Sequence, residues 1–167
     1  MTTSITICIA RQVLTVHDCD LRVESFPVST SSYGIGQEIN SYKTPLGMHK
    51  VKQVIGCDQP IFTRFKARKA IEWFDECPSS DEDLILSRII QLDGIVEGFN
   101  KGLSKDGICV DSHDRYIYIH GTNAEDSIGL PSSIGCIRMR NRDIIKLCDL
   151  INNDTLVDIV NNEVAND

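Results

Sequence analysis

The sequence predicts a mainly β domain with one or two helices. In several segments apolar and polar residues alternate with the period of two that a half-buried strand requires. Polar, glycine-bearing stretches typical of loops separate these segments. Only one segment, after residue 140, carries a clear helical stripe of apolar residues. At 167 residues, the chain is expected to form a single domain with a sizeable core.

The first half of the chain contains most of the predicted strands. Alternation predicts strands over the segments 4–9, 13–17, 21–28 and 44–55. Residues 29–42 are polar and predict a loop, whose Gly34 and Gly36 lack the third glycine of a dinucleotide-binding turn. Residues 61–74 space their apolar side chains roughly as a helix does, which predicts a helix in this part of the chain.

The second half alternates between strands and loops before it ends on a helix and a strand. Residues 83–92 fit either period, and we favour a strand; residues 115–120 are a stronger strand pattern. Asn141 is expected to cap a helix that runs to about residue 151. A last strand at 155–160 then precedes a polar tail, residues 161–167.

Charge and hydropathy exclude several functional classes. The net charge of −7 argues against a nucleic-acid partner, because phosphates require a basic surface. No run of about 18 apolar residues is present, so no membrane span is predicted. The first residues lack the features of a secretory signal, which predicts a cytoplasmic protein, or a periplasmic or cell-envelope protein if a leader has been removed.

Seven cysteines and four histidines could suggest a metal site or disulfides, but their spacing supports neither. No pair has zinc-ligand spacing, so we predict no metal and no cofactor. A core of this size needs no disulfide, and most cysteines are expected to be reduced, buried, small hydrophobic residues. Cys136 is the one that requires a separate argument.

Cys136 and His120 lie at opposite ends of one loop. His120 ends a predicted strand 16 residues before Cys136, which follows a Ser-x-Gly turn. An imidazole can lower the pKa of a thiol and carry its proton, and Gly135 frees backbone N–H groups to meet an oxyanion. This pattern suits acyl transfer through a thiolate. Spacing alone nevertheless favours the alternative, a buried structural thiol.

Longer motifs around these two residues favour a reactive thiol over a buried structural one. The chain carries His120-Gly121-Thr122 and then the run from Ser133 to Met139, with upstream blocks at 27–30 and 44–47. In this order the motifs resemble the signature of the YkuD-type L,D-transpeptidase catalytic domain family. One departure is Ile134, which stands where many members carry a second histidine.

The resemblance implies a fold and a catalytic pair. The implied fold is an L,D-transpeptidase-like β-sandwich of mixed sheets, with residues 58–105 as an elaboration near the cleft. Cys136 would be the nucleophile and His120 its base, oriented by the backbone carbonyl of Gly121. The N–H groups of Gly135 and Cys136 would form the oxyanion hole. The residues implied to support the loop or the substrate are Arg138, Ser133 and Thr122.

The same resemblance implies a substrate. Members act on peptidoglycan stem peptides, so Cys136 would cleave the bond between a diamino acid and a terminal D-alanine and transfer the acyl group to an amine. A carbapenem, as an acylating mimic of such peptides, should inactivate the protein. Two alternatives remain: an L,D-carboxypeptidase of cell-wall recycling that uses water, and a non-catalytic peptidoglycan-binding domain. The oligomeric state is not predicted.

Overall fold

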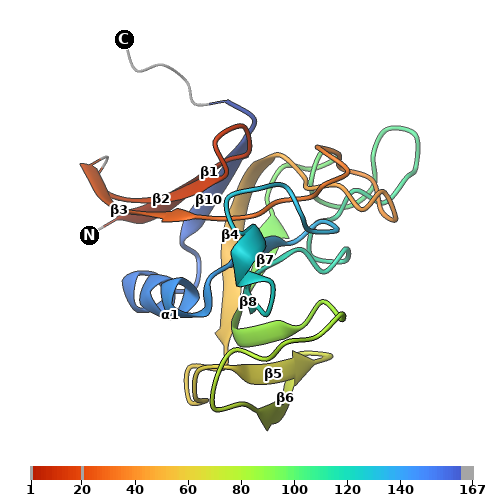
Figure 1. The fold of residues 1–167 in the computed structure, drawn as a ribbon. Coiled ribbons are helices and arrows are strands. Elements are labelled where there is room, and N and C mark those ends of the chain that lie inside the picture. Colours follow the sequence, from red (N-terminus) through yellow and green to blue (C-terminus); the bar gives the residue numbers. More distant parts are fainter. Residues whose placement is uncertain (1, 20, 163–167) are drawn as a thin grey trace.

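The computed structural model describes residues 2–19 and 21–162, and strands dominate this part of the chain (Figure 1). The strands are β1 Thr3–Cys8, β2 Val13–Asp18, β3 Leu21–Pro27, β4 Gly47–Ile55, β5 Thr63–Lys66, β6 Lys69–Trp73, β7 Ile85–Gly94, β8 Tyr118–Thr122, β9 Ile137–Met139 and β10 Leu156–Val160. One α-helix, α1 Asn141–Leu150, and a single 3-10 turn at Glu125–Ser127 complete the described elements.

The strands form one mixed, ten-stranded sheet. Its main order is β3-β2-β1-β10-β4-β7-β5-β6, while β8 also pairs with β7 and β9 pairs with β8. β1 runs parallel to β10 and β8 runs parallel to β9, whereas the other pairs are antiparallel. The mainly β, mixed-sheet fold predicted from the sequence is therefore confirmed.

Strands that are distant in the sheet order share one hydrophobic core. Ile5 and Leu14 of the β1–β2 pair are buried in the same cluster as Ile119 and Ile137 of β8 and β9. The sheet must therefore fold over on itself, as a sandwich does. Helix α1 contacts β7 and β8 and lies below the strands β1 to β3 in the view of Figure 1.

Most predicted elements are present. The alternating segments 4–9, 13–17 and 21–28 become β1 to β3, residues 83–92 fall mainly within β7, and 155–160 contain β10. The predicted strand at 115–120 begins later, at Tyr118. Of the predicted polar tail, residues 163–167 lie outside the described part of the chain.

The helix predicted at residues 61–74 is wrong. This segment forms the hairpin β5–β6, in which Lys66 pairs with Lys69. Phe65 packs into a small cluster, whereas Trp73 is 61% exposed, so the apolar residues do not share the single face that a helix would need. The apparent helical spacing came from apolar residues on two strands joined by a very short turn.

The cysteines are less buried than expected. All seven are free, but only Cys8 is buried, while Cys19 and Cys57 are exposed and the others are half-buried. The general burial that the sequence predicted for these cysteines is therefore wrong. Within the described part of the chain, no helix is long and apolar enough to cross a bilayer.

Candidate active site

Two parallel strands bring the predicted histidine and cysteine to one face. In the register of β8 with β9, His120 pairs with Arg138, and Cys136 is the residue that leads into β9. Residues two apart on a strand, and residues paired across parallel strands, share a face of the sheet. His120 and Cys136 therefore lie on the same face of neighbouring strands, two positions apart.

The His120 imidazole is buried and held by its neighbour. Its Nδ1 lies 2.7 Å from the carbonyl oxygen of Gly121, and because a carbonyl can only accept, Nδ1 carries the hydrogen. Nε2 is thus the ring nitrogen left to act as a base. Burial lowers the pKa of His120, although the Gly121 carbonyl and Asp83 oppose this effect. The ring is neutral at pH 7, as a general base must be.

Gly121 is required by space as well as by its carbonyl. A Cβ at this position would lie 2.5 Å from the side-chain oxygen of Asn141 and 2.5 Å from the backbone oxygen of Leu86. Real Cβ atoms do not approach that closely, and the backbone of β7 cannot move aside cheaply. The His-Gly dipeptide therefore allows β7 and α1 to pack directly against the backbone that orients the imidazole.

The Cys136 thiol is neutral and hydrogen-bonded at rest. Its Sγ donates to the carbonyl of Tyr116 at 3.3 Å and accepts the N–H of Tyr118 at 3.4 Å. Burial raises the pKa of Cys136 to about 11, even though the Tyr118 N–H, Arg138 and Arg115 favour the thiolate. The sequence led us to expect a lowered pKa, and the structure gives the opposite direction.

Side chains and a backbone bridge fix the loop before Cys136. Ser133 Oγ donates to the Cys136 carbonyl at 2.6 Å and accepts the Gly135 N–H at 3.2 Å, which braces the turn. Thr44, from the second upstream block, donates to the Gly135 carbonyl at 2.9 Å. Ser29, from the first block, exchanges two backbone hydrogen bonds of 2.9 Å with Arg138. The separated sequence blocks thus converge on one loop.

The hydrogen bond from the Gly135 N–H to Ser133 Oγ also affects the expected oxyanion hole, because that N–H is one of its two predicted donors. Because the Gly135 N–H already donates to Ser133 Oγ, it can serve an oxyanion only by sharing or releasing that bond. Gly135 has a φ of +133°, a conformation that favours glycine. The role of the Gly135 and Cys136 N–H groups toward an oxyanion stays a prediction.

Comparison with known proteins identifies the family of this chain. Residues 2–159 match the family model YkuD, the L,D-transpeptidase catalytic domain. The chain belongs to the YkuD family. Among curated relatives, the YkuD protein of Bacillus licheniformis is 54% identical over 41 residues, which is 25% of this chain and 25% of that protein.

Solved structures of L,D-transpeptidases share the fold of this YkuD-family chain. L,D-transpeptidase 3 from Mycobacterium tuberculosis superposes with a TM-score of 0.57 at 13% identity, covering 95% of this chain and 61% of that one. An L,D-transpeptidase in complex with imipenem gives a TM-score of 0.53 at 15% identity, covering 95% and 59%. The aligned part of this chain therefore spans about three fifths of those solved chains, and the 41-residue match spans a quarter of the Bacillus relative.

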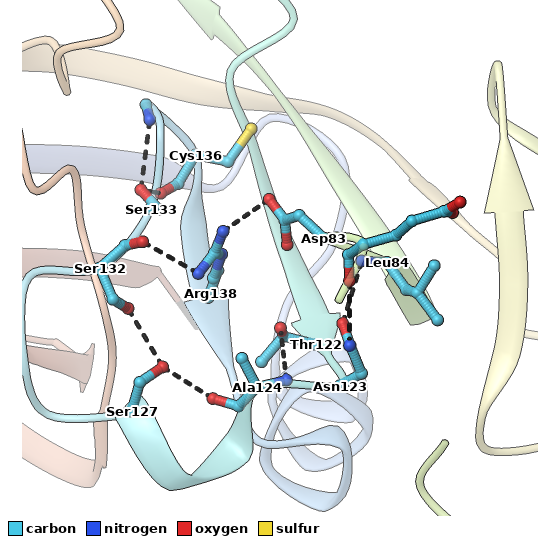
Figure 2. Close-up of polar contacts among 12 residues, drawn as sticks. Asp83, Leu84, Thr122, Asn123, Ala124, Ser127, Ser132, Ser133, Cys136 and Arg138 are labelled. Atoms are coloured by element: carbon cyan, nitrogen blue, oxygen red, sulfur yellow. Dashed lines mark hydrogen bonds and ion pairs between the residues drawn. The ribbon is translucent and has the colours of Figure 1, made fainter. Parts of the chain in front are cut away.

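Arg138 connects the cysteine loop to an acidic residue that the sequence did not single out. Its Nη1 donates to the Ser132 carbonyl at 3.0 Å, and its Nη2 lies 2.6 Å from Asp83 Oδ2 (Figure 2). The Arg138 side chain is only 8% exposed, and its Nε is buried without a partner among the described residues. Of the two roles expected for Arg138, the structure shows a contact that supports the loop.

Asp83 is the main site residue that sequence reasoning missed. It lies just before β7, in the acidic run 81–83, to which no role was assigned from the sequence. Its charge raises the pKa of both His120 and Cys136, which places it close to both. The sequence did contain one indication of an acidic residue in the site, namely Arg138, because a buried guanidinium needs an anionic partner.

Asn141 does not cap its helix as predicted. The helix begins at Asn141, and its side chain is buried instead between Ser87, which donates to Oδ1 at 2.7 Å, and the Thr122 carbonyl, which accepts from Nδ2 at 2.8 Å. The carboxylate of Glu125 accepts the Asn141 backbone N–H and supplies the capping contact. Thr122 Oγ1 accepts the N–H of Ala124, so Thr122 also supports the turn after β8.

One cavity is lined by the cysteine, and a second is lined by the two tyrosines that contact its sulfur. The first, of about 350 Å³, is lined by Cys136, Ile134 and Tyr116, and the second, of about 390 Å³, is lined by Tyr116, Tyr118 and Asp83. A larger cavity of about 700 Å³ is lined by neither the cysteine nor the histidine. We place the candidate site at the two smaller cavities, because they adjoin the chemical groups.

The remaining histidines do not join the site. His49 is buried on β4, where Nδ1 contacts the Gly47 carbonyl at 2.9 Å and Nε2 contacts Ser112 Oγ at 2.8 Å. In the described chain, the one group with metal-ligand proximity is formed by Asp111, His113 and Asp114. The carboxylate of Asp111 already accepts the N–H groups of Gly102 and Asp114, an arrangement that stabilises a turn.

Proposed function

We propose that the protein is a peptidoglycan-processing acyltransferase that uses Cys136 as its nucleophile. The observation that carries this proposal is the bond from His120 Nδ1 to the Gly121 carbonyl. It leaves Nε2 as the basic atom on the face that also carries Cys136. The substrate is a tetrapeptide stem, cleaved between its diamino acid and the terminal D-alanine.

The first half of the reaction forms a thioester. Nε2 of His120 removes the proton from Cys136 Sγ as the sulfur attacks the carbonyl carbon of the diamino acid. The N–H group of Cys136, with that of Gly135, stabilises the negative oxygen. His120 then returns the proton to the nitrogen of D-alanine, the carbon–nitrogen bond breaks, and D-alanine leaves.

The second half transfers the acyl group. An amine of a second stem peptide attacks the thioester carbon, and His120 takes up the proton that the amine loses. The thiolate leaves and recovers its proton from the imidazolium, which regenerates the starting state. Water in place of the amine gives the carboxypeptidase reaction with the same residues, so the acceptor is decided by experiment.

The test is mass spectrometry of a purified tetrapeptide muropeptide incubated with the protein. A cross-linked product in the presence of an amine acceptor supports the transferase, and loss of one alanine without any cross-link identifies the carboxypeptidase. Cys136→Ala should abolish both products. The matched control is Cys19→Ser, which removes an exposed thiol outside the site and should retain activity.

A carbapenem provides a second test that needs no peptide. The protein should gain one covalent adduct by intact mass, located on Cys136 by peptide mapping. An adduct that persists in Cys136→Ala, together with unaltered muropeptides, would refute the proposed function.

A further inference from the structure

A cavity of about 390 Å³ lies between the β5–β6 hairpin and the strands β7 and β8. Tyr116 and Tyr118 line this cavity with their side chains, and their backbone groups hold the Cys136 sulfur. The hydroxyl of Tyr118 and the Cys136 sulfur therefore lie at opposite ends of one tyrosine residue. A group bound in the cavity would be part of a substrate whose reacting carbonyl is at Cys136.

Arg68 is held at the rim of this cavity by both tyrosines. Its Nη1 donates to the Tyr118 hydroxyl at 3.3 Å, and its guanidinium carbon lies 5.3 Å from the centre of the Tyr116 ring. The negative face of an aromatic ring attracts a cation placed over it. These two contacts orient a planar group that can pair with a carboxylate through parallel hydrogen bonds.

The backbone at Arg68 is strained. Lys66 pairs with Lys69, so Ala67 and Arg68 are the two residues of the turn, and they have φ values of 48° and 65°. Two-residue turns with positive φ strongly favour Asn-Gly, because a Cβ is unfavourable there. Strained residues of this kind are concentrated at functional sites. An arginine at this position therefore requires an explanation other than hairpin formation.

The acidic residues around the cavity pair with arginines other than Arg68. Arg64 pairs with Glu82 at 3.0 Å, and Arg138 pairs with Asp83 at 2.6 Å, so the two acidic groups on the rim already have partners. Among the residues that the structure describes, Arg68 has no carboxylate within ion-pair distance. The cavity thus presents an oriented positive charge in a chain of net charge −7.

We propose that Arg68 determines donor specificity by binding a carboxylate at the end of the donor's diamino acid side chain. This inference rests on the proposed function. The carboxylate of the leaving D-alanine adjoins the scissile bond and is too near Cys136 to reach Arg68. A carboxylate at the end of a long side chain is separated from the reacting carbonyl by about a tyrosine length. A lysine-type side chain ends in an ammonium alone, which Arg68 repels.

The experiment compares two tetrapeptides that differ in one group. One carries a diamino acid with a free side-chain carboxylate, and the other carries the same residue with a carboxamide. We expect kcat/KM for D-alanine release to be about tenfold higher for the carboxylate, the size of a charge-assisted contact that water partly screens. The preference should fall as salt is raised.

Arg68→Gly should abolish the preference without unfolding the protein, because glycine is the residue that this turn favours. Its melting temperature should equal or exceed that of the parent. The control is Lys69→Gln, which removes the same charge from the next residue, an exposed lysine that does not line the cavity. This variant should keep the preference.

Each outcome has a distinct meaning. Equal cleavage of both donors by the parent, or a preference retained in Arg68→Gly, would overturn the assignment while the proposed function stands. Loss of preference in both variants would show a diffuse charge effect and also overturn it. Cleavage of neither donor would mean that the proposed function itself has failed.

Discussion

Replacing Asp83 with asparagine should destabilise the protein by breaking the ion pair of Asp83 with the buried Arg138. Arg138 has 8% of its side chain exposed and pairs with Asp83 at 2.6 Å. Removing one partner of a fully buried pair costs about 3–5 kcal/mol, because the other charge stays buried and unpaired. Asp83 is 36% exposed, so water can partly solvate the guanidinium, and we expect a loss of about 1–3 kcal/mol.

For a chain of this length, that loss lowers the melting temperature by roughly 2–10 °C. Glu82→Gln is the matched control, because Glu82 is the neighbouring residue and pairs with Arg64 at 3.0 Å but is 71% exposed. An exposed pair contributes about 0.2–1 kcal/mol. Thermal unfolding followed by circular dichroism, supported by urea titration, would measure the difference.

The charge of Asp83 also predicts the direction in which the reactivity of Cys136 changes when Asp83 is replaced. The negative charge of Asp83 raises the pKa of both His120 and Cys136. Asp83→Asn should therefore shift alkylation of Cys136 to lower pH while it lowers stability. If Asp83→Asn is no less stable than Glu82→Gln, and the alkylation midpoint of Cys136 is unchanged, the charge of Asp83 does not act on the site.

Three further predictions concern individual residues. His120→Ala should slow carbapenem acylation of Cys136 by about 10²-fold or more, measured by intact mass against time, and an unchanged rate would remove His120 from the mechanism. Gly121→Ala should lower the melting temperature as well as activity, because its Cβ would lie 2.5 Å from the Leu86 carbonyl; parental stability would contradict this. Burial lowers the pKa of His49 from 6.5 to about 4, so the unfolded chain binds a proton at a higher pH than the folded chain does. The free energy of unfolding should therefore fall by about 3 kcal/mol between pH 6.5 and pH 4. His49→Gln should remove most of this pH dependence.

Sequence patterns predicted the fold where each strand has one buried face. Buried positions alternate with less buried ones along most of β1 and β2 and along all of β10, since these strands pack one face on the shared core. The hairpin β5–β6 was missed because β6 is exposed along its whole length and so carries no alternation. Its turn has neither asparagine nor glycine, so the residues that usually identify a tight hairpin turn in a sequence are missing.

The site was predicted where its residues lie in one motif. His120, Gly121 and Cys136 fall within a single stretch, and the loop between two parallel strands brings them together. Asp83 was missed and Asn141 was expected to be a helix cap, because their partners Arg138 and Ser87 are distant in sequence and only the folded chain sets those pairs. Spacing along a chain carries no information about which acidic residue a buried arginine will meet.

Burial acts on both members of the proposed catalytic pair and keeps both neutral. It lowers the pKa of His120 and raises that of Cys136 to about 11. Transfer of the proton at rest would therefore create one charge on the buried His120 and one on the half-buried Cys136, which is unfavourable without new partners. During attack on a carbonyl, the negative charge passes to the oxygen, where backbone N–H groups can meet it, and the imidazolium keeps its bond to the Gly121 carbonyl. The thiolate then forms only together with the carbon–sulfur bond. It follows that Cys136 should react slowly with a small alkylating agent at pH 7, more slowly than the exposed Cys19, yet quickly with a carbapenem that fills the site.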